Sequence, residues 1–290
     1  MECYKNILVT GAAGFIGSRL VNGLLQQGKS VIGLDNLDHP CGAKIDCRFR
    51  EGDVRDSQLI DELVEKADVV YHLAAQGHVG RSFVEPQQTF DVNVGGTINV
   101  LKACEKYRRE GYKKRLIFAS SCEVYGTVQT DPISESHPLN PQSPYAKSKV
   151  EAERLCIEYS VRGVDVVVLR LFNTYGPRQR SDNYGAVIPI FVEKVSKGEP
   201  PEISGNGAQT RDFMYIDDAL QALLTFGIMS GSEVYGEPIN IGTGIDISIS
   251  DLANLILKLS DSDLRPIYTE PRPNEIMKLR ADISKARGLG

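Results

Sequence analysis

The sequence lacks three features that would mark a membrane protein, a secreted protein or a nucleic-acid-binding protein. It contains no run of about 18 consecutive apolar residues, so we predict no membrane-spanning helix. Its first residues, 1–5, do not have the apolar segment of a secretory signal peptide. Positive charge is not in excess, since 33 Lys and Arg face 38 Asp and Glu, giving a net charge of −5. We therefore expect a cytoplasmic protein that binds neither membranes nor nucleic acid.

The sequence also has little that would bind a metal. Scattered thiols in an intracellular chain are usually reduced. The spacing of His39, Cys41 and Cys47 fits no standard zinc finger, so we expect no metal and read these three as loop residues. The six cysteines are Cys3, Cys41, Cys47, Cys104, Cys122 and Cys156.

The N-terminal region contains a pattern typical of a dinucleotide site. Residues 6–10 form a short apolar run, which predicts a buried strand. The segment GAAGFIG at 11–17 follows, and then an apolar helical pattern through Leu20 and Leu24. A strand, a glycine turn and a helix N-terminus together can bind a pyrophosphate through backbone N–H groups and the helix dipole. The alternative, a glycine turn that binds nothing, agrees less well with this order of elements.

The next predicted strand indicates which dinucleotide is bound. Residues 30–34 are mainly apolar and end at Asp35. A carboxylate at this place can accept hydrogen bonds from a ribose 2′-hydroxyl, and it would repel a 2′-phosphate. The sequence therefore favours NAD over NADP.

Tyr145 and Lys149 are one helical turn apart, so on a helix they share a face. A free tyrosine has a pKa of about 10, too high for a base at neutral pH. We expect the Lys149 ammonium to lower the pKa of Tyr145 into the range of a general base. The hydroxyl of Ser121 could bind the same substrate oxygen. The alternative is that both side chains belong to a solvated helix face.

The remaining pattern alternates strands and helices. Buried strands are predicted over 68–73, 115–119 and 164–169, with helices over 87–107 and 145–162. This alternation predicts an α/β fold, a Rossmann-type doubly wound parallel sheet. The chain has 290 residues, of which 41% are hydrophobic, enough for a large core.

The C-terminal part has a different character. Prolines punctuate shorter elements after Asn173, which predicts a smaller, discontinuous α+β substrate lobe. We assign 1–171 to the NAD-binding domain and expect 212–234 to return to it. The substrate lobe would comprise 172–211 and 235–290.

An ordered set of motifs along the chain resembles the nucleotide-sugar epimerase/dehydratase family of extended short-chain dehydrogenases/reductases. As a set, and in this order, they are highly specific. The motifs are TGAAGFIG at 10–17, Asp35-Asn36, GDVRD at 52–56, HLAA at 72–75, Asn93, SSCEVYG at 120–126, Tyr145 with Lys149, RLFNTYGP at 170–177, QTRDF at 209–213, NIG at 240–242 and RPNEI at 272–276.

The resemblance implies the residues of the NAD and substrate sites. Asn173 would contact the sugar nucleotide, and Arg211 and Arg272 would grip its diphosphate, since a guanidinium suits phosphate oxygens. For each arginine the alternative is a surface salt bridge. The substrate site would also include Ser121. The NAD site would comprise Gly11, Gly14, Phe15, Ile16, Gly17, Asp35, Asn36, Asp53, Val54, Leu73, Ala74, Ala75, Asn93, Tyr145 and Lys149.

The family also implies a homodimer formed through two helices. Here these would be the helix after Asp91 and the helix that carries Tyr145. Leu101, Tyr107 and Leu155 are candidate apolar contacts, with core packing inside the monomer as the alternative.

The reaction depends on Cys122 and Glu123. In this family Tyr145 would remove the C4 hydroxyl proton while a hydride passes from C4 to NAD, leaving a 4-keto sugar. A 4-epimerase needs no further acid or base, whereas a dehydratase must deprotonate C5. Glu123 stands where 4,6-dehydratases carry a Glu, and the Cys-Glu pair resembles that of UDP-N-acetylglucosamine 5,6-dehydratases. We therefore take Ser121, Cys122, Glu123, Tyr145 and Lys149 as the catalytic residues of a nucleotide-sugar dehydratase that prefers UDP-sugars.

Three alternatives stay open. The first is a UDP-hexose 4-epimerase, in which Glu123 would only accept a structural hydrogen bond. The second is a UDP-glucuronate decarboxylase, although the loop at 74–83 does not resemble theirs, and its His78 agrees better with a dehydratase. The third is a non-catalytic NAD-binding sensor, which would usually have lost Tyr145 or Lys149.

Overall fold

The computed structural model describes residues 4–182, 185–229, 234–272 and 275–290. Several residues of the predicted motifs and segments lie outside these ranges: Cys3, Pro273 and Asn274, and positions 230–233 of the predicted 212–234 segment. Within the described residues, no helix combines the length and apolar character needed to cross a membrane.

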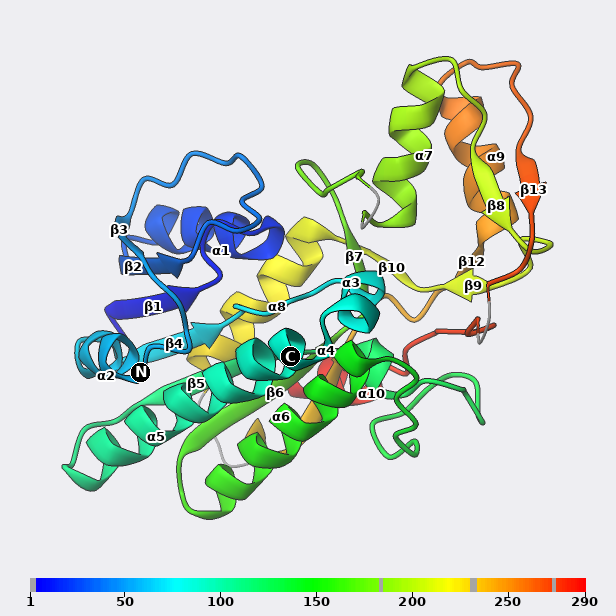
Figure 1. The fold of residues 1–290 in the computed structure, drawn as a ribbon. Coiled ribbons are helices and arrows are strands. Elements are labelled where there is room, and N and C mark those ends of the chain that lie inside the picture. Colours follow the sequence, from blue (N-terminus) through cyan, green and yellow to red (C-terminus); the bar gives the residue numbers. More distant parts are fainter. Residues whose placement is uncertain (1–3, 183–184, 230–233, 273–274) are drawn as a thin grey trace.

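A seven-stranded parallel sheet forms the centre of the molecule (Figure 1). The strand order is β11-β6-β5-β4-β1-β2-β3, so the order reverses between β1 and β4. In such sheets ligands bind in the crevice at the carboxyl ends of the strands on either side of this point. The predicted Rossmann-type sheet is therefore confirmed. The strands are β1 (Asn6–Thr10), β2 (Ser30–Asp35), β3 (Arg48–Glu51), β4 (Val69–His72), β5 (Arg115–Ser121), β6 (Asp165–Leu171) and β11 (Pro238–Ile241).

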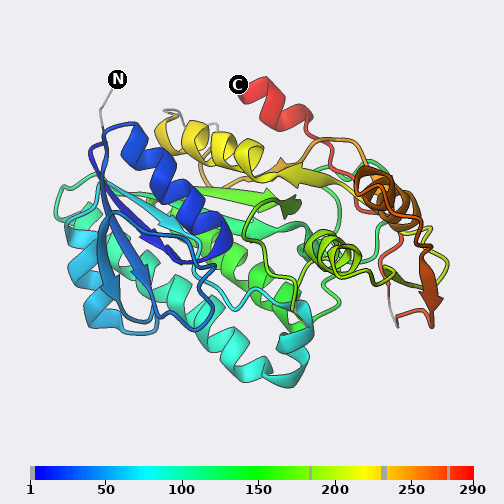
Figure 2. The same ribbon diagram turned by 90° about the horizontal axis from the view of Figure 1, so that it is seen from above.

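Helices cover both faces of the sheet, as Figure 2 shows. The strands are apolar on both sides for this reason. Val9 of β1 packs into a core with α1 and α8, whereas its neighbour Leu8 packs into a second core with α2, α5 and α6. The helices are α1 (Phe15–Gln26) and α8 (Ile216–Ile228) on one face, and α2 (Ser57–Glu65), α5 (Gly96–Arg109) and α6 (Pro144–Val161) on the other.

The region predicted as one helix over 87–107 is made of several pieces. α3 (Val79–Val84) and α4 (Pro86–Phe90) precede a π-helical turn over Asp91–Gly95, which runs directly into α5. π-Helical turns inside helices occur frequently at functional sites. This turn contains Asn93, one of the predicted cofactor residues.

A smaller unit packs beside the sheet, at the upper right of Figure 1. Its apolar core joins α7, α9 and β8, and β13 pairs with β8. Short pairs of strands connect it to the main sheet: β7 with β10, and β9 with β12. The elements are β7 (Asn173–Tyr175), α7 (Val187–Ser196), β8 (Glu202–Ser204), β9 (Thr210–Arg211), β10 (Phe213–Tyr215), β12 (Ile247–Ser248), α9 (Ile249–Leu259) and β13 (Ile267–Thr269).

The main sheet contains one strand that the sequence assigned to the lobe. Strand β11 pairs in parallel with β6, although we expected the whole of 235–290 in the substrate lobe. Ile239 and Ile241 of this strand are buried in the core under α1 and α8. The C-terminal helix α10 (Ser284–Leu289) also packs on this core (Figure 2). The part of 212–229 that forms α8 lies on the same face of the sheet.

Two of the residues proposed as dimer contacts are buried inside the monomer. Leu101 is fully buried, and Tyr107 packs into the same core and donates a hydrogen bond to Asp61. The prediction that Leu101 and Tyr107 contact a second subunit is therefore wrong. The sequence could not separate the two faces of α5, because α2 and α6 cover more of that helix than its apolar pattern suggested. Leu155 is partly buried against this core.

Candidate active site

The glycine loop approaches the β4 loop so closely that side chains cannot fit between them. Gly11 has a φ of 72°, and a Cβ there would lie 2.8 Å from the backbone N of Ala74. A Cβ on Gly17 would lie 2.0 Å from the carbonyl O of Gly11. Gly14 is the N-cap of α1, with no side-chain capping bond. The first N–H groups of α1 are therefore available for an anion, as a dinucleotide pyrophosphate requires. Phe15 and Ile16 are half-buried in this first turn.

Asp35 lies at the edge of this glycine loop. Its carboxylate accepts hydrogen bonds from the backbone N–H of Ala13 at 2.9 Å and of Leu37 at 2.9 Å. Strand β2 thus places a fixed negative charge beside the loop, at the carboxyl end of the sheet. This is where a carboxylate could accept bonds from a ribose 2′-hydroxyl.

Next to Asp35, the Asn36 amide approaches Asp53, with 3.4 Å between Nδ2 and Oδ2. Arg55 donates to the Asp53 carboxylate from Nε at 2.9 Å and from Nη2 at 2.7 Å, and these bonds hold the pKa of Asp53 below its usual value. Val54 is buried against Gly96, where a Cβ would lie 2.5 Å from Val54 Cγ2. This corner of the predicted NAD site therefore has one polar and one apolar wall.

Asn93 joins the loop after β4 to helix α6. Its Oδ1 accepts from the Gln76 N–H at 2.7 Å, and its Nδ2 donates to Ser148 Oγ at 2.9 Å. Because Ser148 precedes Lys149, the π-helical turn positions both the cofactor loop and the catalytic helix. Leu73, Ala74 and Ala75 are half-buried in this loop.

Tyr145 and Lys149 lie in the first turns of α6, and Ser121 ends β5 beside them. The helix begins where it does because Ser143 accepts from the Ala146 N–H and Pro144 occupies N1. Lys149 Nζ donates to the Ala119 carbonyl at 2.9 Å and lies 6.0 Å from the centre of the Tyr145 ring.

The pKa of Tyr145 is shifted in the direction opposite to our expectation. Burial raises it, and a hydrogen bond with Ser121 opposes this effect only in part. Burial also lowers the pKa of Lys149 to about 8. The prediction that Lys149 would lower the pKa of Tyr145 considered charge alone, and in this structure desolvation of both groups is the larger effect.

Cys122 and Glu123 follow in a single 3₁₀ turn, Cys122–Val124. Cys122 is 3% exposed, and burial raises the pKa of its thiol, so the sulfur is protonated at neutral pH. Asn173 Nδ2 lies 4.0 Å from this sulfur. Burial also raises the pKa of Glu123, while the nearby Arg211 opposes the shift. The predicted residues Ser121, Cys122, Glu123 and Asn173 are therefore brought together.

Of the two arginines, Arg211 lies beside Glu123. Arg211 donates to Glu275 at 2.6 Å and to the Ile276 carbonyl at 2.7 Å. Glu275 also raises the pKa of Glu123, so all three charged groups lie near one another. Arg272 is exposed, and none of the residues that the structure describes forms an ion pair with it.

A pocket of about 370 Å³ opens beside these residues. Its walls are the loop 127–131, which continues from the Cys122–Val124 turn, and the segment 275–278. Its volume falls in the range of small-molecule sites. Glu275, the partner of Arg211, is one of its lining residues.

Sequence reasoning missed a buried polar network behind the site. Arg170 Nη2 donates to Glu153 at 2.7 Å, and Ser120 donates to the same carboxylate. Arg170 Nη1 also donates to the Tyr125 hydroxyl, which donates to Asn240 at 2.6 Å. The network fixes both ends of the segment that carries Ser121 and Glu123. The signal was present, since Arg170 is a charged residue that directly follows the apolar run 166–169 in β6.

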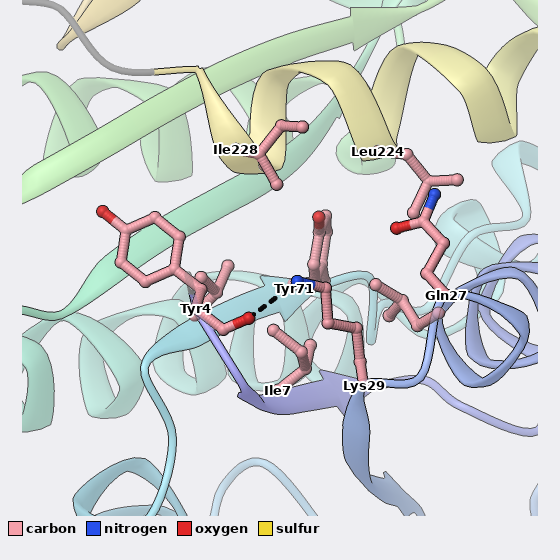
Figure 3. A pocket seen from close by; sticks show the side chains of 10 residues that line it. Tyr4, Ile7, Gln27, Lys29, Tyr71, Leu224 and Ile228 are labelled. Carbon is pink, nitrogen blue, oxygen red and sulfur yellow. Dashed lines mark hydrogen bonds between the residues drawn. The ribbon is translucent and has the colours of Figure 1, made fainter. Parts of the chain in front are cut away.

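The cavity shown in Figure 3 lies at the opposite end of the sheet. It is lined by Tyr4, Lys29 and Val69, which lie at the amino ends of β1, β2 and β4, and by residues of α1 and α8. Its volume is about 10 Å³, roughly the space of one water molecule. It is too small for a substrate and too far along the strands to reach Tyr145.

Comparisons with known proteins agree with this geometry. Residues 7–242 match the model of the NAD dependent epimerase/dehydratase family. A UDP-glucose 4-epimerase of Mycolicibacterium smegmatis is 36% identical, covering 97% of this chain and 90% of the relative. The crystal structure of the UDP-glucose 4-epimerase of Thermotoga maritima superposes with a TM-score of 0.91 at 33% identity, covering 98% and 91% of the two chains.

A dehydratase is similar to nearly the same degree. The structure of an NAD-dependent NDP-hexosamine 5,6-dehydratase involved in tunicamycin biosynthesis superposes with a TM-score of 0.86 at 32% identity, covering 98% and 91% of the two chains. The family uses NAD, for which the glycine loop and Asp35 provide a fitting site. On its motifs, its fold and these similarities, this chain belongs to the NAD-dependent epimerase/dehydratase family.

Proposed function

We propose that this protein is a nucleotide-sugar dehydratase that works through a 4-keto intermediate. The observation that carries the proposal is the placement of Glu123. Its carboxyl group lies in a buried turn directly after Ser121, and its pKa is raised by burial and moderated by Arg211. A carboxyl group with a raised pKa suits proton transfer near neutral pH.

The first step would be oxidation at C4. NAD supplies the hydride acceptor. Tyr145 accepts the proton of the C4 hydroxyl, and Ser121, which hydrogen-bonds Tyr145, orients the same oxygen. The Lys149 ammonium stabilises the tyrosinate that accepts this proton, and its bond to the Ala119 carbonyl holds it in place.

The second step would be loss of water across C5 and C6. Glu123 takes the C5 proton of the 4-keto sugar, and the C6 hydroxyl leaves as water after protonation. The hydride would return from the bound cofactor: delivered to C6 with a proton to C5 it would complete a 4,6-dehydration, and delivered to C4 with a proton to the C4 oxygen it would complete a 5,6-dehydration. The buried, protonated thiol of Cys122 either donates the proton to the leaving hydroxyl or only packs against Asn173.

The substrate is a nucleotide sugar, and a UDP-sugar is favoured. Arg211 offers a guanidinium for the diphosphate once it exchanges Glu275 for phosphate oxygens. The Thermotoga maritima relative was solved with UDP-glucose. Arg272 is exposed and could offer a second guanidinium to the diphosphate.

A UDP-hexose 4-epimerase is the second candidate. It is favoured by the 36% identity to the Mycolicibacterium smegmatis 4-epimerase. The oxidation step is the same, but Glu123 would then have no chemical role. The enzyme would be an isomerase and not a lyase.

Mass spectrometry of the products from a panel of UDP-, dTDP- and GDP-sugars tests the proposal. A dehydratase forms a product lighter by one water. A decarboxylase forms one lighter by carbon dioxide, and an epimerase gives unchanged mass with altered retention. No change in any sugar, with NAD bound, would favour the sensor.

The dehydratase is proposed to act as a cytoplasmic homodimer. Its two functional units would be an NAD domain over 1–171 with α8, and a substrate lobe around α7 and α9. The dimer would form through the outer face of α6, where Ile157 and Val161 are exposed.

A further inference from the structure

The segment between β2 and β3, residues 36–47, crosses the carboxyl end of the sheet, and we call it the strap. One side of the strap lies on the glycine loop. The Cys41 N–H donates to the Ala13 carbonyl at 2.8 Å. The Cys41 sulfur lies 3.2 Å from Ser18 Oγ and 3.5 Å from the Gly14 carbonyl O, so the strap contacts the first turn of α1.

The other side of the strap reaches the opposite wall of the crevice. His39 accepts a hydrogen bond from the guanidinium of Arg81 in α3. Its ring also packs edge to face on the ring of His78, with centroids 5.9 Å apart. His78 belongs to the loop that follows β4. The strap therefore connects the β1 loop to the region after β4, the two walls of the crevice where the strand order reverses.

The His39–Arg81 contact has a defined chemistry. A guanidinium can only donate, so His39 Nε2 must be unprotonated and the ring neutral. Burial and the charges of Arg180 and Arg81 lower the pKa of His39, in agreement with a neutral ring, while Asp38 and Asp182 oppose them. Arg81 is held in orientation by Glu85, which accepts from its Nε at 2.8 Å.

We propose that the strap is a latch that retains NAD, and that His39 and Arg81 are the pair that fastens it. The inference rests on the proposed function only for the reason why NAD should be retained. The contacts of the strap do not depend on that function. A reaction that returns the hydride to the same sugar requires the reduced cofactor to stay bound between the two steps. A segment fastened to both walls of the crevice slows its departure, because the strap must open first.

The test is the rate at which bound NAD exchanges with excess labelled NAD in the absence of any sugar. His39→Ala and Arg81→Gln should each release NAD about five- to tenfold faster than the wild type, the loss of one charge-assisted hydrogen bond. The double variant should release it no faster than His39→Ala, since that change already removes the bond from Arg81 together with the packing on His78. His39→Gln, which restores an acceptor, should be slower than His39→Ala.

Lys44→Ala is the matched control, because Lys44 lies in the strap but pairs only with Asp46 among the described residues. Its release rate should equal that of the wild type, and thermal unfolding of the NAD-free variants should be unchanged. Wild-type release rates in both His39→Ala and Arg81→Gln would overturn the latch, as would equal acceleration by Lys44→Ala. A wild type that holds NAD but modifies no nucleotide sugar would contradict the proposed function alone.

Discussion

At the scale of residues, the sequence placed Tyr145, Lys149, Ser121 and Glu123 correctly in one region but could not give their electrostatics. Spacing shows which side chains share a helix face, whereas desolvation depends on all that packs around them. The raised pKa of Tyr145 and the value of about 8 for the pKa of Lys149 both result from burial.

Replacement of Tyr145 by Phe should lower turnover by roughly 10²–10⁴, the usual contribution of a general base. The ring is kept, so NAD and substrate affinities should change little. Steady-state kinetics with the substrate found by the panel measures this. Tyr159→Phe on the same helix is the control and should keep normal turnover. Near-normal turnover of Tyr145→Phe would remove this residue from the mechanism.

Asp35 should determine the preference for NAD over NADP. Asp35→Asn keeps one oxygen, which can accept from Ala13 or from Leu37 but not from both, and it removes the negative charge, so NADP should bind closer to the level of NAD. Asp35→Ala should in addition weaken NAD. Titration of both cofactors by calorimetry measures these affinities. A wild type that binds NADP as tightly as NAD would contradict the ribose role of Asp35.

At the scale of elements, the apolar runs predicted five of the seven strands of the sheet. The fully buried strands β4, β5 and β6 have near-continuous apolar sequences, which a parallel sheet requires. Strand β3 is an edge strand with the sequence RFRE and is mostly exposed, so no apolar signal marked it. Strand β11 begins with a proline and was read as part of a proline-rich lobe, although a proline is tolerated at the first residue of an edge strand.

His72 ties β1, β4 and α5 together and should make stability depend on pH. Its ring nitrogens contact Thr10 Oγ1 at 2.8 Å and Thr97 Oγ1 at 3.1 Å. Burial and Lys149 lower its pKa from 6.5 to about 3. Below pH 6.5 the unfolded chain binds a proton that the folded chain does not. Stability should therefore fall as the pH drops from 6.5 towards 3, by up to about 1.4 kcal/mol per pH unit.

Urea unfolding at pH 7 and pH 5 measures this effect. His72→Gln can still bond both threonines but does not titrate. Its midpoint should change less between the two pH values than that of the wild type. Equal pH dependence of the two proteins would show that other groups cause it.

At the scale of the whole molecule, the site residues gather where the main sheet meets the smaller unit. The carboxyl ends of β5 and β6 contribute Ser121 and the segment to Asn173, and the smaller unit contributes Arg211 and Glu275. The sequence predicted this arrangement because the order of strands, helices and motifs already requires it. The sequence did not show which residues of helix α5 lie on the surface of the monomer, since Leu101 and Tyr107 are buried.

The proposed dimer should be visible in solution. Val161 is 85% exposed and Ile157 is 38% exposed on the outer face of α6, where a second copy could cover them. Sedimentation velocity at micromolar concentration should give a dimer, and the double change Ile157→Lys with Val161→Lys should give a monomer. A wild type that sediments only as a monomer would contradict the proposal.

The central claim is that Glu123 takes the C5 proton, and exchange of that proton with solvent tests it most directly. In deuterated water, a wild type that catalyses 4,6-dehydration should place deuterium at C5 of the product. One that catalyses 5,6-dehydration should release the C5 hydrogen to solvent, because C5 then becomes an alkene carbon without hydrogen. Glu123→Gln has nearly the same shape, so it should still form NADH at C4 and then stall, with no deuterium at C5. Cys122→Ala should slow the elimination less. If the wild type neither places deuterium at C5 nor loses the C5 hydrogen, and Glu123→Gln keeps most activity, the protein is a 4-epimerase and Glu123 is not a catalytic base.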